Sequence, residues 1–192
     1  MSDSKFFAAY SERLQDVLKG ADWSGVAKLA NSMHDCWKRG GQVFLCGNGG
    51  SAGNAIHLAN DFLYGIAKKS GAGLRVTALS SNSAVITCLA NDIGYEAIYA
   101  EQIAVLASPG DILIVLSGSG NSPNIVSSLI KARELGVKSC AILGYSGGKC
   151  KELADIPIHF KVNDMQIAED LQLIVGHMLM QFLYEHRDHS SL

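Results

Sequence analysis

The fold is decided by the segment DILIVLSGSGNSP, residues 111–123. It opens with a short, almost uninterrupted apolar run and ends in serines that alternate with glycines. An apolar run of this length, bounded by turn residues, is typical of a strand buried on both faces, as in a parallel sheet. Pro123 suits the first turn of a helix. The segment therefore predicts a buried strand, a tight loop and a helix.

The same alternation extends outward in both directions. Strands are predicted at 42–46, 74–79, 111–116 and 139–143, with a weaker one at 156–160. Helices are predicted at 51–66, 82–106, 122–135, 147–153 and, as a long final helix, at 166–186. Strands that alternate with helices indicate an α/β fold with a doubly wound parallel sheet.

Residues 4–39 precede the first strand and carry two apolar stripes at helical spacing. They predict an N-terminal pair of helices separated by a turn, with Asp22 as the N-cap of the second. Because no strand precedes these helices, we expect them to cover the sheet or a partner subunit. We expect one domain over 1–192, made of these helices (1–39), the sheet with its helices (40–186) and a polar, frayed tail (187–192).

Composition narrows the range of functions. The 192 residues are 48% hydrophobic and 18% charged, with a formal net charge of −2 and no long basic run. These values indicate an ordered domain with a small ligand and give no electrostatic support for nucleic-acid binding. No stretch reaches membrane-spanning length, and the N-terminus has no signal-peptide pattern. Five cysteines without a CxxC pair indicate reduced thiols and a cytoplasmic protein.

Two loops have the composition of an anion site. The first, 46–52, is rich in glycine and runs directly into a predicted helix, whose N–H groups favour an anion. The second, 116–122, combines three hydroxyls with glycines. Hydroxyls and backbone N–H groups together can surround a phosphate without a lysine, and both loops follow buried strands, where ligands of such sheets bind.

Two other interpretations of the loops compete with this one. The first loop also fits the G-x-G-x-x-A pattern of dinucleotide-binding proteins, but the segment after the second strand, 79–82, has no carboxylate for a ribose. Both loops could instead be structural glycine turns. Serines repeated so densely after a buried strand have little structural purpose, which favours the phosphate site.

These loops resemble those of the SIS (sugar isomerase) family. The order of elements, the segment Asn91-Asp92-Ile93-Gly94 and the final helix are similar to the phosphoheptose isomerase type. The resemblance implies a five-stranded parallel sheet and a homotetramer. It also implies conversion of sedoheptulose 7-phosphate to D-glycero-D-manno-heptose 7-phosphate, with zinc bound in several members.

The resemblance also implies a set of site residues. The metal ligands would be His57, Asp61, Glu169 and His177, where aspartate replaces the family's glutamate and glutamate its glutamine. Gly118 stands where the family has a threonine. The expected substrate contacts are Asn48, Gly49, Gly50, Ser51, Asn91, Asp92, Ser117, Ser119, Ser122 and Glu169.

Chemistry at these positions can be followed from the residues themselves. His57 and Asp61 are four apart on a predicted helix and share one face. Asp61 can take a proton from the carbon beside a sugar carbonyl, and His177 suits the second proton transfer. Zinc would polarise the carbonyl. Glu169 and His177 are about 12 Å apart along a predicted helix, so both could reach one metal ion only at the limit of their length. Ligands from different subunits would bind the ion more easily, which favours a site between subunits.

Each residue also has a plainer interpretation, and the chain has other candidate functions. His177 lies in an apolar helix and could be a core or interface histidine. His57 and Asp61 could be a surface pair. At the level of function, the alternatives are a non-catalytic SIS adaptor, resembling the protein that binds a replication initiator, or an isomerase of another phosphosugar. The adaptor lacks the acid and the final-helix histidine, so Asp61 and His177 favour an enzyme.

Overall fold

Five parallel strands form the sheet that the sequence predicts. The computed structural model describes residues 3–68 and 71–187. The strands are β1 (Gln42–Gly47), β2 (Arg75–Ala78), β3 (Ile112–Ser117), β4 (Lys138–Leu143) and β5 (Ile156–His159). Their order is β2-β1-β3-β4-β5, and every neighbouring pair is parallel. The fold class predicted from the apolar runs is confirmed.

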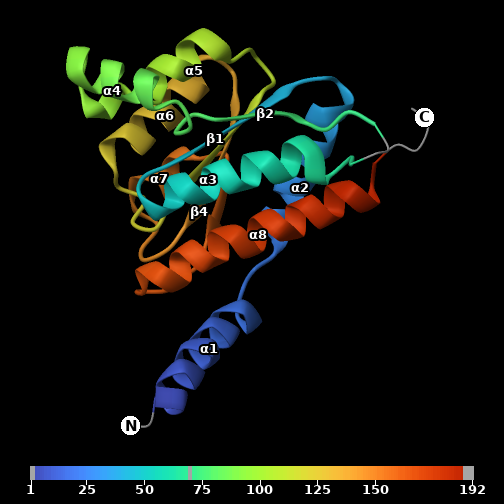
Figure 1. The fold of residues 1–192 in the computed structure, drawn as a ribbon, viewed down its shortest axis with the longest axis vertical. Helices are drawn as coiled ribbons and strands as arrows, with labels where there is room; N and C mark the ends of the chain where they lie inside the picture. Colours follow the sequence, from blue (N-terminus) through green and yellow to red (C-terminus); the bar gives the residue numbers. More distant parts are fainter. Residues whose placement is uncertain (1–2, 69–70, 188–192) are drawn as a thin grey trace.

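Helices cover both faces of this sheet (Figure 1). The described helices are α1 (Asp3–Lys19), α2 (Ser24–Lys38), α3 (Gly50–Asn60), the π-helical turn η1 (Asp61–Gly65), α4 (Ser83–Asp92), the 3₁₀ turn η2 (Tyr95–Ala97), α5 (Ala100–Leu106), α6 (Pro123–Glu134), α7 (Gly148–Leu153) and α8 (Met165–Glu185). Helices α2, α3 and α8 pack on one face, and α5, α6 and α7 on the other. No described helix is long and apolar enough to cross a bilayer.

The strands are apolar throughout because they contribute to two cores. Val43 and Leu45 of β1 point into the core under α2, α3 and α8, whereas Phe44 and Cys46 point into the core under α5, α6 and α7. All four side chains are fully buried. Successive residues of a strand face opposite sides, so burial of both sides produces a continuous apolar run instead of an alternating one.

One predicted helix is interrupted. The segment 82–106, expected as a single helix, forms α4, η2 and α5. The break is at Gly94, whose φ of 133° lies outside the helical region. Its N–H donates to the carbonyl of Leu89, which closes the end of α4. A glycine adopts such a φ without steric cost, so the chain turns here.

The N-terminal helices behave differently from one another. Helix α2 packs on the sheet, and its N-cap is Trp23, one residue later than predicted. Asp22 instead accepts the backbone N–H and the hydroxyl of Ser24, and these bonds lower its pKa. Helix α1 has no buried residue and projects from the body of the molecule (Figure 1). The frayed tail was predicted at 187–192, of which 188–192 lie outside the described residues.

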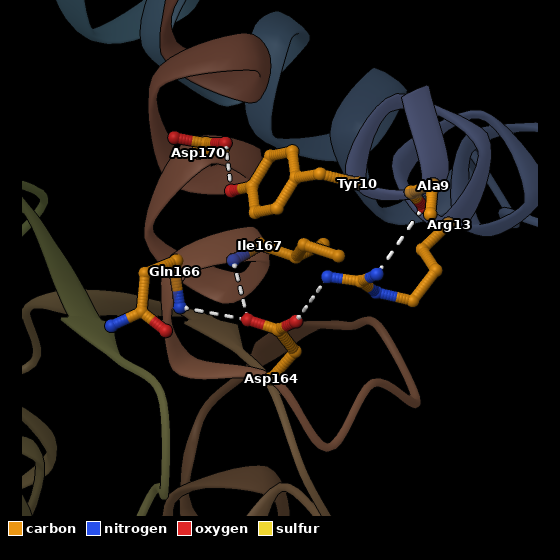
Figure 2. Close-up of polar contacts among 7 residues, drawn as sticks. All are labelled: Ala9, Tyr10, Arg13, Asp164, Gln166, Ile167 and Asp170. Atoms are coloured by element: carbon orange, nitrogen blue, oxygen red, sulfur yellow. Dashed lines mark hydrogen bonds and ion pairs between the residues drawn. The ribbon is translucent and has the colours of Figure 1, made fainter. Parts of the chain in front are cut away.

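Two polar contacts tie α1 to the start of α8 (Figure 2). The hydroxyl of Tyr10 donates to Asp170 over 2.6 Å. Arg13 pairs with Asp164 at 3.3 Å, and Asp164 also caps α8 by accepting backbone N–H groups. Burial and then the bond to Asp170 raise the pKa of Tyr10 to about 12. The N-terminal helix is therefore attached to the helix that carries Glu169 and His177.

The strand order places both glycine-rich loops at one point of the sheet. The chain moves from β1 outward to β2, then returns past β1 to β3, so the direction of winding reverses between β1 and β3. Loops that follow the two strands at such a reversal leave on opposite faces and open a crevice between them, where ligands of α/β sheets bind. The loops predicted to bind an anion follow β1 and β3.

Candidate active site

The loop after β1 is shaped by glycines. Gly49 has a φ of 56°, and a Cβ on Gly47 would lie 2.6 Å from the carbonyl oxygen of Ser51, so neither position accommodates a side chain without strain. Helix α3 begins at Gly50. Buried Ser51 accepts a hydrogen bond of 3.0 Å from Gln172 of α8. The loop is therefore held against α8 at the start of α3.

Glu169 lies beside this helix start. A Cβ on Gly50 would be 2.5 Å from both carboxylate oxygens of Glu169. A negative charge is favourable at the N-terminus of a helix. Asn54 donates to the backbone carbonyl of Glu169 and to the side chain of Gln172, each over 3.0 Å. The carboxylate of Glu169 thus occupies part of the space at the first loop where an anion was predicted to bind.

The loop after β3 carries the hydroxyls. Ser117 accepts the backbone N–H of Gly120 over 3.1 Å, and Ser119 accepts that of Asn121 over 3.3 Å. The hydroxyl of Ser122 has no hydrogen-bond partner within residues 3–68 and 71–187. Helix α6 begins at Pro123, one residue after the predicted start. All three hydroxyl groups can donate to a phosphate at this helix start, because they currently accept bonds or make none.

Gly118, where the resemblance implies a threonine in the family, lies against the first turn of α8. A Cβ at this position would lie 2.6 Å from the sulfur of Met165 and 3.9 Å from the methyl group of Ala168. The first turn of α8 therefore fills the space that a side chain would need. The second loop packs directly against α8, just as the first loop does.

Two histidines and a carboxylate meet between α3 and α8. The Nε2 atoms of His57 and His177 are 3.0 Å apart. Asp61 Oδ2 lies 3.4 Å from the first and 3.6 Å from the second. These three side chains, here called the His–Asp–His group, can offer ligand atoms that all lie within 4.8 Å of one another. The predicted face shared by His57 and Asp61 is confirmed, and His177 joins it from α8.

Local backbone features bring the group together. Asp61 opens the π-helical turn η1, where its carbonyl accepts the N–H of Ile66 five residues later. Such turns are frequent at functional sites, since the extra residue changes where side chains point. A Cβ on Gly176 would overlap the side chain of Leu58. This glycine lets α3 and α8 approach closely, one residue from each histidine.

Glu169 does not belong to the His–Asp–His group. The group forms within one chain, so the argument that two subunits must share the ligands loses its basis. Two imidazoles and a carboxylate are a usual donor set for Zn²⁺ with an open fourth position. The side chains of His57 and His177 are 49% and 48% exposed, which leaves the group accessible from outside.

Two further predicted contacts, Asn91 and Asp92, bond locally. Asn91 and Asp92 end α4 and are exposed. Their side chains bond to one another over 2.7 Å, and Cys88 donates to Asp92. Among the residues that the structure describes, neither side chain has a hydrogen bond to the two loops.

Asn124, Gln172 and Tyr95 are polar site residues that the sequence did not single out. Asn124 and Gln172 are each 1% exposed, and both bond to a predicted contact, Asn48 and Ser51 respectively. Tyr95 donates to Asn48 over 3.2 Å. Asn124 directly follows Pro123, so its closeness to the second loop was visible in the sequence, but its partner lies 76 residues away.

The chain is thus a parallel α/β protein with two glycine-rich loops at the reversal point of the sheet and a His–Asp–His group between α3 and α8. The family model of the SIS domain matches residues 5–144. Proteins named phosphoheptose isomerase are similar over nearly the whole chain. That of Aliarcobacter butzleri is 35% identical over 185 residues, 96% of this chain and 97% of its own. That of Helicobacter pylori strain P12 is 33% identical over 190 residues, covering 97% and 96%.

A solved structure agrees with these sequences. The phosphoheptose isomerase from Francisella tularensis superposes with a TM-score of 0.89 at 28% identity, covering 96% of this chain and 100% of its own. The chain belongs to the SIS-domain family, phosphoheptose isomerase type, and is an aldose–ketose isomerase.

Proposed function

We propose that this enzyme converts sedoheptulose 7-phosphate to D-glycero-D-manno-heptose 7-phosphate. The observation that carries the proposal is the His–Asp–His group on the same pair of helices that holds the glycine-rich loops. His57 lies seven residues after Gly50, about 10 Å along α3. An extended sugar, such as an open-chain 2-ketose 7-phosphate, is long enough to run from the start of α3, beside Glu169, to this group. The names of the relatives support the same substrate class.

In the proposed mechanism, the phosphate binds to the serines of the second loop and orients the sugar. Asp61 removes the proton from C1, and the electron pair moves to form an enediolate with the C2 oxygen. The proton returns to C2 while the C1 oxygen becomes the aldehyde. His177, within 3.6 Å of Asp61, moves the proton between the two oxygens. No oxidant or reductant is needed, because the substrate and product are isomers.

Zinc fits the His–Asp–His group. His57, Asp61 and His177 would hold it, and the bound ion would polarise the sugar carbonyl and stabilise the enediolate. Glu169 would then contact the sugar beside Gly50 and not the ion. The absence of a thiolate from this set suggests weaker binding than in a cysteine site.

Exposed apolar side chains on α1 and η1 support a homotetramer with sites at subunit interfaces. Helix α1 has no fully buried residue, and its Phe6 and Phe7 are 67% and 68% exposed. Near the His–Asp–His group, Leu63 and Tyr64 are also more than half exposed. Apolar surface of this kind is typical of protein contacts.

We place the enzyme in the cytoplasm, since its five cysteines are unpaired.

A coupled isomerase assay over a panel of ketose and aldose phosphates, with and without added zinc, tests the function. We expect the highest kcat/KM on sedoheptulose 7-phosphate. A higher kcat/KM on another member of the panel would reassign the substrate. Phosphosugar binding without any turnover, in the presence of zinc, would instead favour the non-catalytic adaptor.

Sedimentation at micromolar concentration tests the assembly, and a monomer there would refute the tetramer.

A further inference from the structure

Asn48 and Asn124 join the two loops through a reciprocal pair of hydrogen bonds. Asn48 lies in the loop after β1, and Asn124 in the first turn of α6. Asn48 Nδ2 donates to Asn124 Oδ1 over 2.9 Å, and Asn124 Nδ2 donates to Asn48 Oδ1 over 2.8 Å. Asn124 is 1% exposed, so its amide has no alternative partner in solvent.

A backbone group fixes the orientation of both amides. The N–H of Ile125 donates both to Asn124 Oδ1 over 3.0 Å and to the carbonyl of Ser122 over 3.1 Å. Because a backbone N–H can only donate, it favours the oxygen of Asn124 on its side, which leaves the nitrogen facing Asn48. The oxygen of Asn48 must then face that nitrogen. Neither amide can rotate by 180° without placing two oxygens or two nitrogens against each other.

Two tyrosines complete the environment of Asn48. Tyr95 donates to Asn48 Oδ1 over 3.2 Å. The hydroxyl of Tyr99 donates to the carbonyl of Gly47 over 2.5 Å, and burial raises the pKa of Tyr99, which keeps it a donor. The oxygen of Asn48 therefore has both acceptor positions filled, and one of its two N–H bonds is used by Asn124. A single N–H of Asn48 is left for a ligand.

We propose that Asn124 is a positioning residue of the active site: its buried amide holds Asn48 in one orientation and fixes the first loop relative to the second. This inference rests on the proposed function for its kinetic consequences, but not for its consequences for anion binding. The loops follow β1 and β3, whose carboxyl ends alone do not fix how the loop tips lie. The amide pair links the loop after β1 to the first turn of α6, so both loops would meet one phosphosugar in a fixed geometry.

The variant Asn124→Asp tests this orientation without changing side-chain size. Aspartate keeps an acceptor for Ile125 but places a second oxygen against Asn48 Oδ1. At pH 8, we expect inorganic phosphate to bind about tenfold or more weakly, the scale expected when a buried polar group loses its partner. The matched control is Ser128→Ala, which removes a buried hydroxyl from the same helix without touching Asn48. Its phosphate affinity should stay within about twofold of wild type.

Protonation should rescue the aspartate variant. A protonated carboxyl has an O–H that can replace the amide donor, so the ratio of variant to wild-type affinity should rise toward one as the pH falls from 8 to 5.5. Dividing by the wild-type value at each pH removes the titration of phosphate itself. A role in folding alone predicts a ratio that does not change with pH.

Thermal unfolding and a double-variant comparison keep the test decisive. If Asn124→Asp does not fold at pH 8, the variants Asn48→Ala, Asn124→Ala and their double give the same information. The proposal expects the double variant to lose no more phosphate affinity than the worse single one. The proposal would be overturned if the loss of phosphate affinity in the double variant equalled the product of the two single losses. Wild-type phosphate affinity in folded Asn124→Asp at pH 8 would also overturn it. Failure of the wild type to isomerise any phosphosugar would refute the proposed function and leave these phosphate measurements valid.

Discussion

Replacing Asp61 with asparagine should abolish most turnover and leave substrate binding nearly intact. The amide matches the carboxylate in size, so it fits 3.4 Å from His57 and 3.6 Å from His177. It cannot accept the proton from the sugar carbon. The loss of one general base lowers kcat by about 10²- to 10⁴-fold, or about 2.7–5.4 kcal/mol in activation free energy. Phosphosugar affinity, measured by calorimetry, should change by less than about threefold because the serine loop is untouched.

Two further variants sharpen this prediction. Asp35→Asn makes the same chemical change at an exposed position of α2 and should keep wild-type kcat. Asp61→Glu lengthens the side chain by about 1.5 Å. An enzyme for heptose phosphate that tolerates a short base should keep or gain rate, whereas a pocket built around aspartate should lose rate, since displacements near 1 Å can matter about 100-fold. Robust turnover by Asp61→Asn on any phosphosugar would remove Asp61 as the base and leave His177.

Four other predictions concern metal, phosphate, packing and the N-terminal helix. Elemental analysis after zinc soaking should find about one ion per subunit in the wild type and little in His57→Ala; equal content would exclude His57 as a ligand. Ser119→Ala should weaken inorganic phosphate binding by about 1–3 kcal/mol, and unchanged affinity would show that the second loop is not the phosphate site. Gly176→Ala should push α8 from α3, lowering unfolding free energy by about 1–3 kcal/mol and reducing kcat; a wild-type melting temperature would refute the close-approach argument. The raised pKa of Tyr10, about 12, means that its bond to α8 stabilises the fold below pH 10 and is lost as the pH rises toward 12, so the Tm difference between wild type and Tyr10→Phe should disappear over that interval, and a constant difference would contradict it.

Several structural features were accessible from sequence because their physical cause is local. The apolar runs at 42–46 and 111–116 predicted buried strands, and both are strands with two buried faces. Pro123 marked the start of α6. Helical spacing placed His57 and Asp61 on one face. In each case the signal depends on residues within a few positions of one another.

Other features depend on contacts between distant segments. The partners of Asn124 and Gln172 lie 76 and 121 residues away, and nothing in the neighbouring sequence specifies them. The family resemblance suggested that Glu169 would join the metal ligands, but its carboxylate lies beside Gly50 instead. Side-chain length and sequence spacing cannot decide between these positions, because the packing of α8 on α3 does.

Local sequence patterns were enough to predict the α/β class, the two glycine-rich loops and the residue types of the site. Hydrophobic periodicity and backbone preferences are properties of short segments, and they remain readable without coordinates. The reversal of the chain between β1 and β3, the meeting of His177 with His57 and Asp61 within one chain, and the bonding of half-buried Asn48 to buried Asn124 became visible only in three dimensions. These features follow from strand order and helix packing, in which each contact depends on where every other element lies.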